Sequence, residues 1–353
     1  MPLRVLHLVG SAVSDFLCDL SRLYARDCLR TTQNSDRFEP HIAYVTPDRR
    51  WRFPADLTRE AIAGAPALSA AEGIRVTSSL GIDVMVPQMF CLPGMTQYRA
   101  LFDLLGIRYV GNPPDVMALG SHKARAKAIV AAAGVDVPAG EVVRAGELPA
   151  IEPPVVVKPV DADNSLGVTL VRDRKALADA IATACEHSDT ALVETYVELG
   201  REVRSGIIVR SGELVCLPLE EYRVDPIGNP IRHAADKLRR DGDGDGELAL
   251  VAKQRALAWM ADPNDPITGL VWEAARRCHR ALGCRDYSLF DFRIDPGGRP
   301  WFLEAGLYCS FSRQSVISMM AATAGIATDE LFAIALDETL AASSVLRPAR
   351  SAA

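Results

Sequence analysis

The sequence predicts an α/β protein with more than one domain. Its 353 residues exceed one small domain, and 49% hydrophobic with 24% charged residues is an ordinary globular composition. Strand-like runs alternate with helix-like patterns in the first third, which is typical of a parallel sheet. The last third combines antiparallel strands with neighbouring helices. We therefore expect an N-terminal parallel α/β domain followed by α+β parts.

Composition excludes several classes of protein. The net charge of −6 provides no basic field for nucleic acid or an anionic membrane. The eight cysteines include no C-x-x-C pair, which argues against a zinc module or a disulfide framework and is typical of reduced thiols. No uninterrupted stretch of about 18 apolar residues is present. The expected location is the cytoplasm.

The first third reads as strands separated by helices. Three runs predict buried strands: "LRVLHLVG" (3–10), "FEPHIAYVT" (38–46) and "GIDVMVPQMF" (81–90). An amphipathic helix and a short strand follow in 98–111. Because ligands of parallel sheets gather at the carboxyl ends of the strands, a site is expected there. "NPPD" (112–115) then breaks the chain, and the first boundary is placed there.

The remainder predicts two further domains and a tail. A helix is expected over 120–134, with Ser121 as N-cap, Gly134 as C′ residue, and Lys123 and Lys127 one turn apart on one face. Strands are expected in 153–160, 189–197, 203–209, 214–219, 287–294 and 301–304, and helices near 268–282 and 314–336. The predicted domains are 1–112, 113–199 and 200–340, with a flexible tail at 341–353.

A hairpin carries two unexpected carboxylates. "YSLFDFRIDPGGRPWFLEA" (287–305) has a turn signal between two β runs. If Pro296 and Gly297 are the central turn residues, Asp291 lies opposite Phe302, and Glu304 is its diagonal neighbour on the same face. A three-residue loop would turn the faces apart. The alternative is two unrelated surface acids, but both interrupt apolar strands, where an unpaired charge is costly.

A lysine and a small polar loop point to a nucleotide. Lys158 interrupts "VVVKP", and a half-buried lysine at a strand end needs an anionic partner. "DADNSLGV" (161–168) follows and could direct backbone N–H groups at phosphate oxygens. The pattern G-x-x-x-x-G-K-[ST] is absent from the sequence. Together with two acids suited to Mg²⁺, these features predict a Mg-nucleotide site.

Several motifs in order resemble one family. "LFDLLGIRYVGNPPDVMALGSHKARAKAIVAAAGVDVP", "PPVVVKP", "NSLGV", "ALVETYV", "GRE", "RALGCRDYSLFDFRI" and "WFLEA" resemble the D-alanine–D-alanine ligase branch of the ATP-grasp superfamily, over residues 80–335. The resemblance implies a three-domain ATP-grasp fold with ATP between the sheets of the central and C-terminal domains. It also implies Mg²⁺, with Mn²⁺ as an alternative, and an ADP-forming carbon–nitrogen ligase that acts through an acyl phosphate.

The resemblance assigns nucleotide contacts residue by residue. The phosphate-binding residues correspond to Lys123, Lys158 and the loop residues Asn164, Ser165, Leu166 and Gly167. The hinge beside adenine and the ribose-binding acid correspond to Glu194, Tyr196, Val197 and Glu202.

The resemblance also assigns the reacting centre. Lys237 in "AADKLRR" resembles the loop lysine that reaches the γ-phosphate, and Asp291 and Glu304 match the magnesium ligands. Ser315 falls where the family contacts the carboxylate of the second substrate. Asp15 is the candidate for the ammonium-binding acid near the N-terminus.

Departures from the family concern the amino-acid sites. Gly306 replaces the family's metal-binding Asn, and Leu289 replaces an Arg that helps to hold the intermediate. Arg293 or Arg313 could substitute for that Arg. The H-G-x-x-G-E-D-G signature is missing, with "MFCLPGMTQ" (89–97) in its place. D-alanyl-D-alanine is therefore not the expected product.

These departures predict different substrates. We expect a ligase of specialised metabolism, such as antibiotic biosynthesis, that joins two small-molecule amino acids, one of them non-standard, into a dipeptide or γ-glutamyl-type product. Two alternatives stay open: a ligase that uses an amine other than an amino acid, and a nucleotide-binding protein that has lost catalysis. Neither nucleic acid nor a membrane is an expected partner. A homodimer is one option for the assembly, and the sequence does not decide the oligomeric state.

Overall fold

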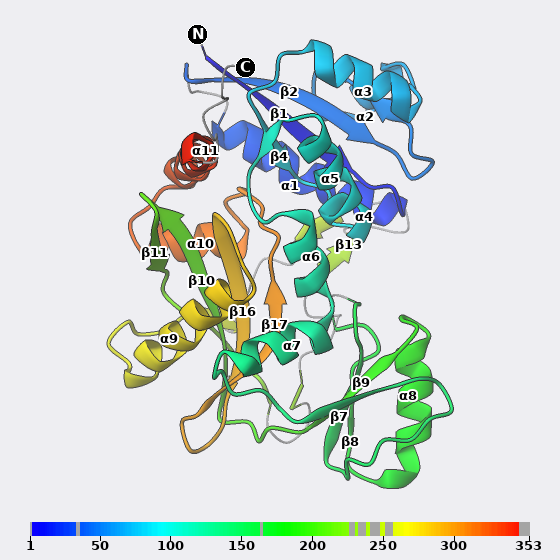
Figure 1. The fold of residues 1–353 in the computed structure, drawn as a ribbon, viewed down its shortest axis with the longest axis vertical. Coiled ribbons are helices and arrows are strands. Elements are labelled where there is room, and N and C mark those ends of the chain that lie inside the picture. The colour runs from blue at the N-terminus through cyan, green and yellow to red at the C-terminus, as the bar shows by residue number, and fades with distance from the viewer. Residues whose placement is uncertain are drawn as a thin grey trace, which may run out of the picture.

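The computed structural model describes residues 2–32, 36–162, 165–225, 230–231, 238–240, 248–250 and 257–345. Their strands form four sheets, three of which organise the molecule (Figure 1). The first sheet lies near the N-terminus, the second in the middle of the sequence and the third in its last part.

The N-terminal sheet has the strand order β3-β2-β1-β4-β5. Its strands are β1 (Leu3–Gly10), β2 (Phe38–Val45), β3 (Trp51–Arg52), β4 (Val84–Pro87) and β5 (Arg108–Tyr109). All neighbours are parallel except β2 and β3, as the alternating pattern predicts. The strand expected over 81–90 is shorter, because only four of its residues join the ladder. The surrounding helices are α1 (Asp15–Thr32), α2 (Arg59–Gly64), α3 (Ala70–Ser79), α4 (Leu92–Met95) and α5 (Gln97–Leu104).

Two helices lead out of this unit, α6 (Pro114–Ser121) and α7 (Lys123–Ala132). The prediction that Ser121 caps a single helix over 120–134 was wrong. Ser121 is the last residue of α6, where its Oγ donates to the carbonyl of Ala118 at 3.0 Å. His122 leaves helical geometry and caps α7 instead, because its Nδ1 accepts from the Arg125 N–H at 3.4 Å. Gly134 follows α7 with φ of +76°, as expected of a C′ glycine.

The central sheet has the strand order β6-β9-β7-β8, and its neighbours are antiparallel. Its strands are β6 (Gly140–Val143), β7 (Val155–Pro159), β8 (Thr169–Val171) and β9 (Ala191–Thr195). A 3-10 turn, η1 (Arg174–Ala176), leads into α8 (Leu177–Cys185), which packs on this sheet. The apolar side chains of these elements form a cluster of their own, which includes Val155, Val157, Leu177 and Ile181.

The C-terminal sheet is antiparallel, in the order β15-β12-β10-β16-β17, with β11 added to β10. Its strands are β10 (Arg201–Arg210), β11 (Glu213–Cys216), β12 (Glu220–Tyr222), β15 (Ala258–Met260), β16 (Tyr287–Ile294) and β17 (Pro300–Gly306). A separate hairpin joins β13 (Leu238–Arg240) to β14 (Leu248–Leu250).

Three helices accompany this sheet: α9 (Pro266–Ala281), α10 (Val316–Thr323) and α11 (Thr328–Val345). The single helix predicted near 314–336 is two helices, because the chain turns at Gly325, whose φ is +81°. The flexible tail predicted from residue 341 was also placed too early, since α11 continues to Val345. Residues 346–353 lie outside the described part of the chain.

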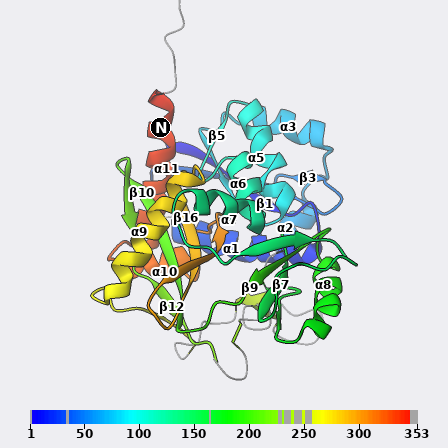
Figure 2. The same ribbon diagram turned by 60° about the horizontal axis from the view of Figure 1, so that its bottom comes forward.

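The N-terminal and C-terminal units share apolar packing. Val5 and Val86 of the N-terminal sheet belong to one buried cluster with Phe311, Ile317 and Phe332. A second cluster packs α6 and α7 against the C-terminal sheet rather than against the central sheet. Figure 2 shows β7, β9 and α8 at one side of the molecule, beside this combined body.

Asn112 connects the two units at their junction. It is fully buried, and its Nδ2 donates to the carbonyls of Tyr287 at 3.0 Å and Leu307 at 2.8 Å. Its Oδ1 accepts from the Arg285 N–H at 2.7 Å. One amide side chain therefore satisfies three buried backbone groups of the C-terminal unit.

Among the described residues, no single helix has the length and apolar composition to cross a membrane. The helices α10 and α11 meet this test only as a pair, bent by 106°. Several of their apolar side chains, including Met320 and Phe332, pack in the cluster shared with the N-terminal sheet.

Candidate functional site

A pocket lies between the central sheet and the C-terminal sheet. It holds about 800 Å³ of space outside protein atoms, part of it open to solvent. Its lining includes nine residues that the sequence predicts for the site: Lys123, Lys158, Ser165, Glu194, Val197, Glu202, Asp291, Arg293 and Glu304. Residues that are far apart in the sequence therefore meet at one place.

Other predicted site residues are not in this lining. Described residues outside it are Asp15, Leu166, Gly167, Tyr196, Arg313 and Ser315. Two predicted residues, Asn164 and Lys237, lie outside the described residues. Their predicted roles stay predictions.

The hairpin of β16 and β17 places the two acids opposite each other. Ile294 pairs with Pro300, so the loop between the strands is longer than the predicted two-residue turn. As a result Phe302 pairs with Phe292, whereas the prediction paired it with Asp291. The register then shifts between Asp291 and Phe292, which brings Asp291 opposite Glu304. The predicted pairing was wrong at the turn, but the bulge restores the common face of the two acids.

One face of the C-terminal sheet is charged, and the other is apolar. The pairs Glu202 with Arg293 and Arg204 with Asp291 lie side by side on β10 and β16. The residues that alternate with Asp291 and Arg293 on β16, Phe290 and Phe292, are fully buried on the opposite face. Strict alternation of apolar and charged residues in "FDFR" thus produces a packed core on one side and a polar pocket wall on the other.

Arg204 is a site residue that the sequence analysis missed. Its Nη2 donates to Asp291 Oδ2 at 2.6 Å, and its Nε donates to Oδ1. Burial disfavours the charged guanidinium, yet the neighbouring Asp291 raises the pKa of Arg204 well above its usual value. The signal was available, because Arg204 alternates with apolar Val203 in β10 and so shares the face of Glu202.

Lys123 extends from the first turn of α7 to the part of the pocket that holds Glu304. Its Nζ donates to the carbonyl of Ala162 at 2.5 Å and lies 3.9 Å from Glu304 Oε2. Its backbone N–H donates to the carbonyl of Val160 at 2.8 Å, which ties the start of α7 to the end of β7. The ammonium group is therefore next to both the small polar loop and the acid of β17.

Glu194 lies between two lysines at the other wall. Lys158 Nζ donates to its Oε1, and Lys127 Nζ lies 3.0 Å from its Oε2. All three side chains are at least nine-tenths buried. Burial would raise the pKa of Glu194, but Lys127 and Lys158 hold it below its usual value. Glu194 is thus an ionised, paired carboxylate.

Arg293 is held by Glu202 and by two backbone carbonyls. Its Nη2 donates to Glu202 Oε2 and to the carbonyl of Pro230, each at 2.8 Å, and its Nη1 donates to the carbonyl of Val197 at 3.3 Å. The guanidinium lies 5.6 Å from the ring centroid of Tyr196. These contacts position the hinge and the predicted ribose acid, and they place Arg293 away from the role of the missing Arg at Leu289.

Two of the residues predicted for the amino-acid sites, Ser315 and Arg313, lie at the start of α10, and the third, Asp15, lies in α1. Ser315 caps α10, and its Oγ donates to the carbonyl of Ser310 at 2.5 Å. Arg313 pairs with Asp27 of α1 at 3.2 Å. Asp15 begins α1. Arg313 therefore joins two units, and it does not reach the described pocket lining.

The sequence analysis also missed the apolar wall of the pocket. It is formed by Pro138, Val156, Val168, Val197, Ile231 and Leu303, of which only Val197 was predicted. Such a wall suits the flat faces of a purine ring, whereas the lysines suit phosphates. Isolated valines and leucines in strands give no sequence signal, because most of them are core residues.

The two acids fit a Mg²⁺ ion that shares its shell with phosphate and water. Asp291 and Glu304 face each other across the strands, and Glu304 is 38% exposed. The described residues contain no group of three or more His, Cys, Asp or Glu side chains arranged for a metal. Two carboxylates with phosphate oxygens are a usual Mg²⁺ environment, so the pair fits a metal that arrives with the nucleotide.

Sequence comparison finds relatives over most of the chain. A family model described as D-ala D-ala ligase C-terminus matches residues 140–238. The D-alanine–D-alanine ligase of Gloeobacter violaceus is 30% identical over 250 residues, which cover 69% of this chain and 76% of that protein. The corresponding enzyme of Methylorubrum extorquens (strain PA1) is 32% identical over 242 residues, covering 66% and 73%.

Solved structures show the same fold at low identity. The VanG D-Ala:D-Ser ligase from Enterococcus faecalis superposes with a TM-score of 0.76 at 19% identity, covering 96% of this chain and 100% of that chain. The D-alanine–D-alanine ligase from Bacillus anthracis, complexed with ATP, gives 0.70 at 17% identity, covering 97% and 99%.

Proposed function

Because this chain belongs to the D-alanine–D-alanine ligase-like branch of the ATP-grasp superfamily, we propose that it joins a carboxylate to the amine of an amino acid through an acyl phosphate. The predicted three-domain ATP-grasp fold is confirmed by the structural relatives. The protein is an ATP-dependent, ADP-forming ligase that makes amide bonds. One observation carries the proposal: Lys123, Lys158, Asp291 and Glu304 line one pocket.

The pocket provides charge where the reaction develops it. Lys123 and Lys158 hold phosphate oxygens, and Asp291 and Glu304 would hold Mg²⁺, which neutralises phosphate charge when it is bound. An oxygen of the substrate carboxylate attacks the γ-phosphorus while the bond from that phosphorus to the β,γ-bridging oxygen breaks, so ADP leaves. The amine nitrogen, after losing a proton to solvent, then attacks the acyl carbon, and inorganic phosphate leaves with the bonding electron pair.

The substrates are proposed to differ from two D-alanines. Leu289 packs in the apolar cluster shared with the N-terminal unit, so no cation can act from that position. The segment "MFCLPGMTQ" (89–97), which replaces the family's signature, follows β4. It contains the short helix α4 and ends at the first residue of α5. We propose two amino acids, one of them non-standard, joined in specialised metabolism, with Ser315 beside the carboxylate of the amine substrate.

The retained pocket argues against a decayed nucleotide-binding protein. Glu304 is partly exposed in an otherwise apolar strand, and Arg204 and Asp291 form a largely buried ion pair. Burying charges costs free energy, which a protein without catalytic activity would not need to spend. A ligase that uses an amine other than an amino acid differs from the main proposal only in the second substrate, so the substrate screen below separates the two.

The test is ADP release with ATP and pairs of amino acids, followed by product masses. We expect ADP with selected pairs, a product lighter than the sum of the two amino acids by one water, and little ADP with D-alanine alone. An accepted amine substrate should be compared with its amide analogue. Equal turnover of the two would contradict the proposed contact between Ser315 and the carboxylate of the amine substrate. Efficient dimerisation of D-alanine would contradict the proposed substrates.

A further inference from the structure

Lys127 is a buried lysine beside the pocket that has no role in the proposed reaction. It lies one turn after Lys123 on α7, and its side chain is 6% exposed. Its Nζ is 3.0 Å from Glu194 Oε2 on the central sheet and donates to the carbonyl of Phe302 on the C-terminal sheet at 3.0 Å. It therefore contacts both walls of the pocket from behind.

Lys127, Glu194 and Lys158 form a row of alternating charges. Lys127 and Lys158 occupy different oxygens of Glu194, so one negative charge lies between two positive charges. The row as a whole keeps one positive charge. Glu194 and Lys158 line the pocket, whereas Lys127 does not. The net positive charge of the row therefore reaches the pocket on the ammonium group of Lys158.

Removing the charge of Lys127 would lower the net charge of this row from +1 to zero. Glu194 and Lys158 would then form a neutral buried pair, and phosphate oxygens would have to compete with Glu194 for the same ammonium group. Burial lowers the pKa of Lys127 to about 8, and Glu194 opposes this effect. Lys127 is therefore a buried cation held in place mainly by its carboxylate partner.

We propose that Lys127 is a positioning residue that neutralises Glu194, which leaves the charge of Lys158 free to bind the phosphates of the nucleotide. The inference rests on the proposed use of ATP and adds a residue that does not touch the nucleotide. A merely structural lysine would stabilise the fold and affect every ligand of the pocket alike. A lysine that sets the charge of Lys158 affects only ligands that carry phosphate.

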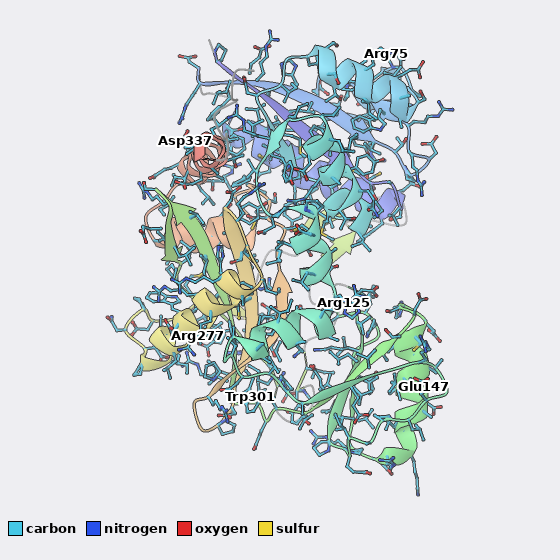
Figure 3. The ribbon with its side chains drawn as sticks, viewed as in Figure 1. Arg75, Arg125, Glu147, Arg277, Trp301 and Asp337 are labelled. Atoms are coloured by element: carbon cyan, nitrogen blue, oxygen red, sulfur yellow. The ribbon has the colours of Figure 1, made fainter. Side chains whose placement is uncertain are left out.

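The experiment compares dissociation constants of ADP and adenosine, measured by calorimetry. Lys127→Gln removes the charge but keeps an amide that can donate to Glu194 and to the carbonyl of Phe302. We expect ADP binding to weaken by about 10-fold or more, the size of a lost charged hydrogen bond, and adenosine binding to change by less than about 2-fold. Arg125→Gln, at an exposed position of the same helix (Figure 3), is the control and should change neither.

A double variant makes the test specific. In Lys127→Gln/Glu194→Gln the lysine and the acid are both neutral, so Lys158 again carries an unopposed charge. The preference for ADP over adenosine should return to within about 3-fold of the wild type, because the row again carries one positive charge, on Lys158. If the preference stays as low as in Lys127→Gln, the inference is overturned.

Two further variants keep the test valid if Lys127→Gln does not fold. Lys127→Arg keeps the charge and should keep the preference for ADP. Glu194→Gln alone should raise the preference, because the row then carries two positive charges instead of one. A fall of the preference in Glu194→Gln contradicts the inference even if Lys127→Gln does not fold. If the wild-type protein binds neither ADP nor ATP, the proposed function fails; if it binds them and Lys127→Gln keeps the preference, only the role of Lys127 fails.

Discussion

Arg204 brings a positive charge to Asp291, the proposed metal ligand, from a neighbouring strand. The family pattern implies an Arg two residues before Asp291, where this chain has Leu289. In the structure, the guanidinium that meets Asp291 comes from β10, at the register position directly opposite. Two parallel contacts fix both the position and the plane of the carboxylate. This clamp leaves Asp291 little freedom to rotate away from the pocket.

Replacing Arg204 should impair chemistry more than nucleotide binding. Arg204→Met leaves Asp291 without its bidentate partner, so we expect kcat to fall by about 10²-fold, as is typical when a preorganised charge is lost. The affinity for ADP should change by less than about 3-fold, because Arg204 is absent from the pocket lining. Steady-state ADP release and calorimetry measure the two quantities.

Arg201→Met on the same strand is the control for this prediction. Arg201 pairs with Glu221 and Asp265, outside the pocket lining, and should leave kcat unchanged. A fall of equal size in the two variants would mean that loss of an ion pair in β10, rather than the clamp on Asp291, impairs the enzyme.

At the scale of elements, the bulge in the β16–β17 hairpin lets two consecutive residues face the pocket. Leu303 and Glu304 both line it, although neighbours in a regular strand point to opposite faces. The bulge therefore places an apolar side chain and the acid proposed to bind Mg²⁺ on the same wall. Phe302, just before them, stays fully buried with Phe290 and Phe292.

Leu303→Ala separates these two functions of the hairpin. Removing the side chain takes apolar contact from the nucleoside, so KM for ATP should rise by about 5- to 30-fold, which corresponds to the burial of a few methyl or methylene groups. The effect on kcat should be less than about 3-fold, because Glu304 and its partner keep their register. Leu270→Ala, at a position 56% exposed on α9, is the control.

The opposite split would contradict this account. If Leu303→Ala lowers kcat strongly and leaves KM for ATP unchanged, then Leu303 supports the geometry of Glu304 and does not contact the nucleoside.

The same hairpin shows what the sequence could and could not predict. Alternation in "FDFR" and "WFLE" was sufficient to place Asp291 and Glu304 at one site. The loop length and the bulge could not be read from the sequence. Each shifts the register by one residue in the same direction, so that together they move Asp291 from Phe302 to Glu304, which is on the same face. The ion-pair partners of the arginines could not be predicted either. The sequence does not distinguish Arg204, Arg293 and Arg313, because the carboxylate that a long side chain reaches depends on how the strands and units pack.

Helix boundaries failed for a related reason. The alanine-rich segment 120–134 favours a helix throughout, yet His122 ends one helix and caps the next. This break orients α7 so that Lys123 lines the pocket and Lys127 reaches Glu194 behind it. Tertiary packing against the C-terminal sheet, rather than local preference, decides where the helices end.

At the scale of the whole molecule, Asn112 fastens the N-terminal unit to the C-terminal unit. Asn112→Ala would leave the carbonyls of Tyr287 and Leu307 and the N–H of Arg285 without this partner in the interior. We expect a loss of about 2–4 kcal/mol in the free energy of unfolding, since buried polar groups without partners are costly. Urea denaturation measures this loss, and the exposed Asn264→Ala is the control. A loss below about 0.5 kcal/mol would show that water replaces the side chain.

The separate apolar cluster of the central sheet has a consequence for motion. Because β6 to β9 and α8 pack mainly on one another, while the other two units share a core, we expect the central unit to open as one body more readily than the other two. Its backbone amides then exchange with deuterium from solvent at a rate set by this partial opening, faster than those of β1 or β16. A nucleotide held between the sheets links the two bodies, so binding slows exchange in strands that it never touches.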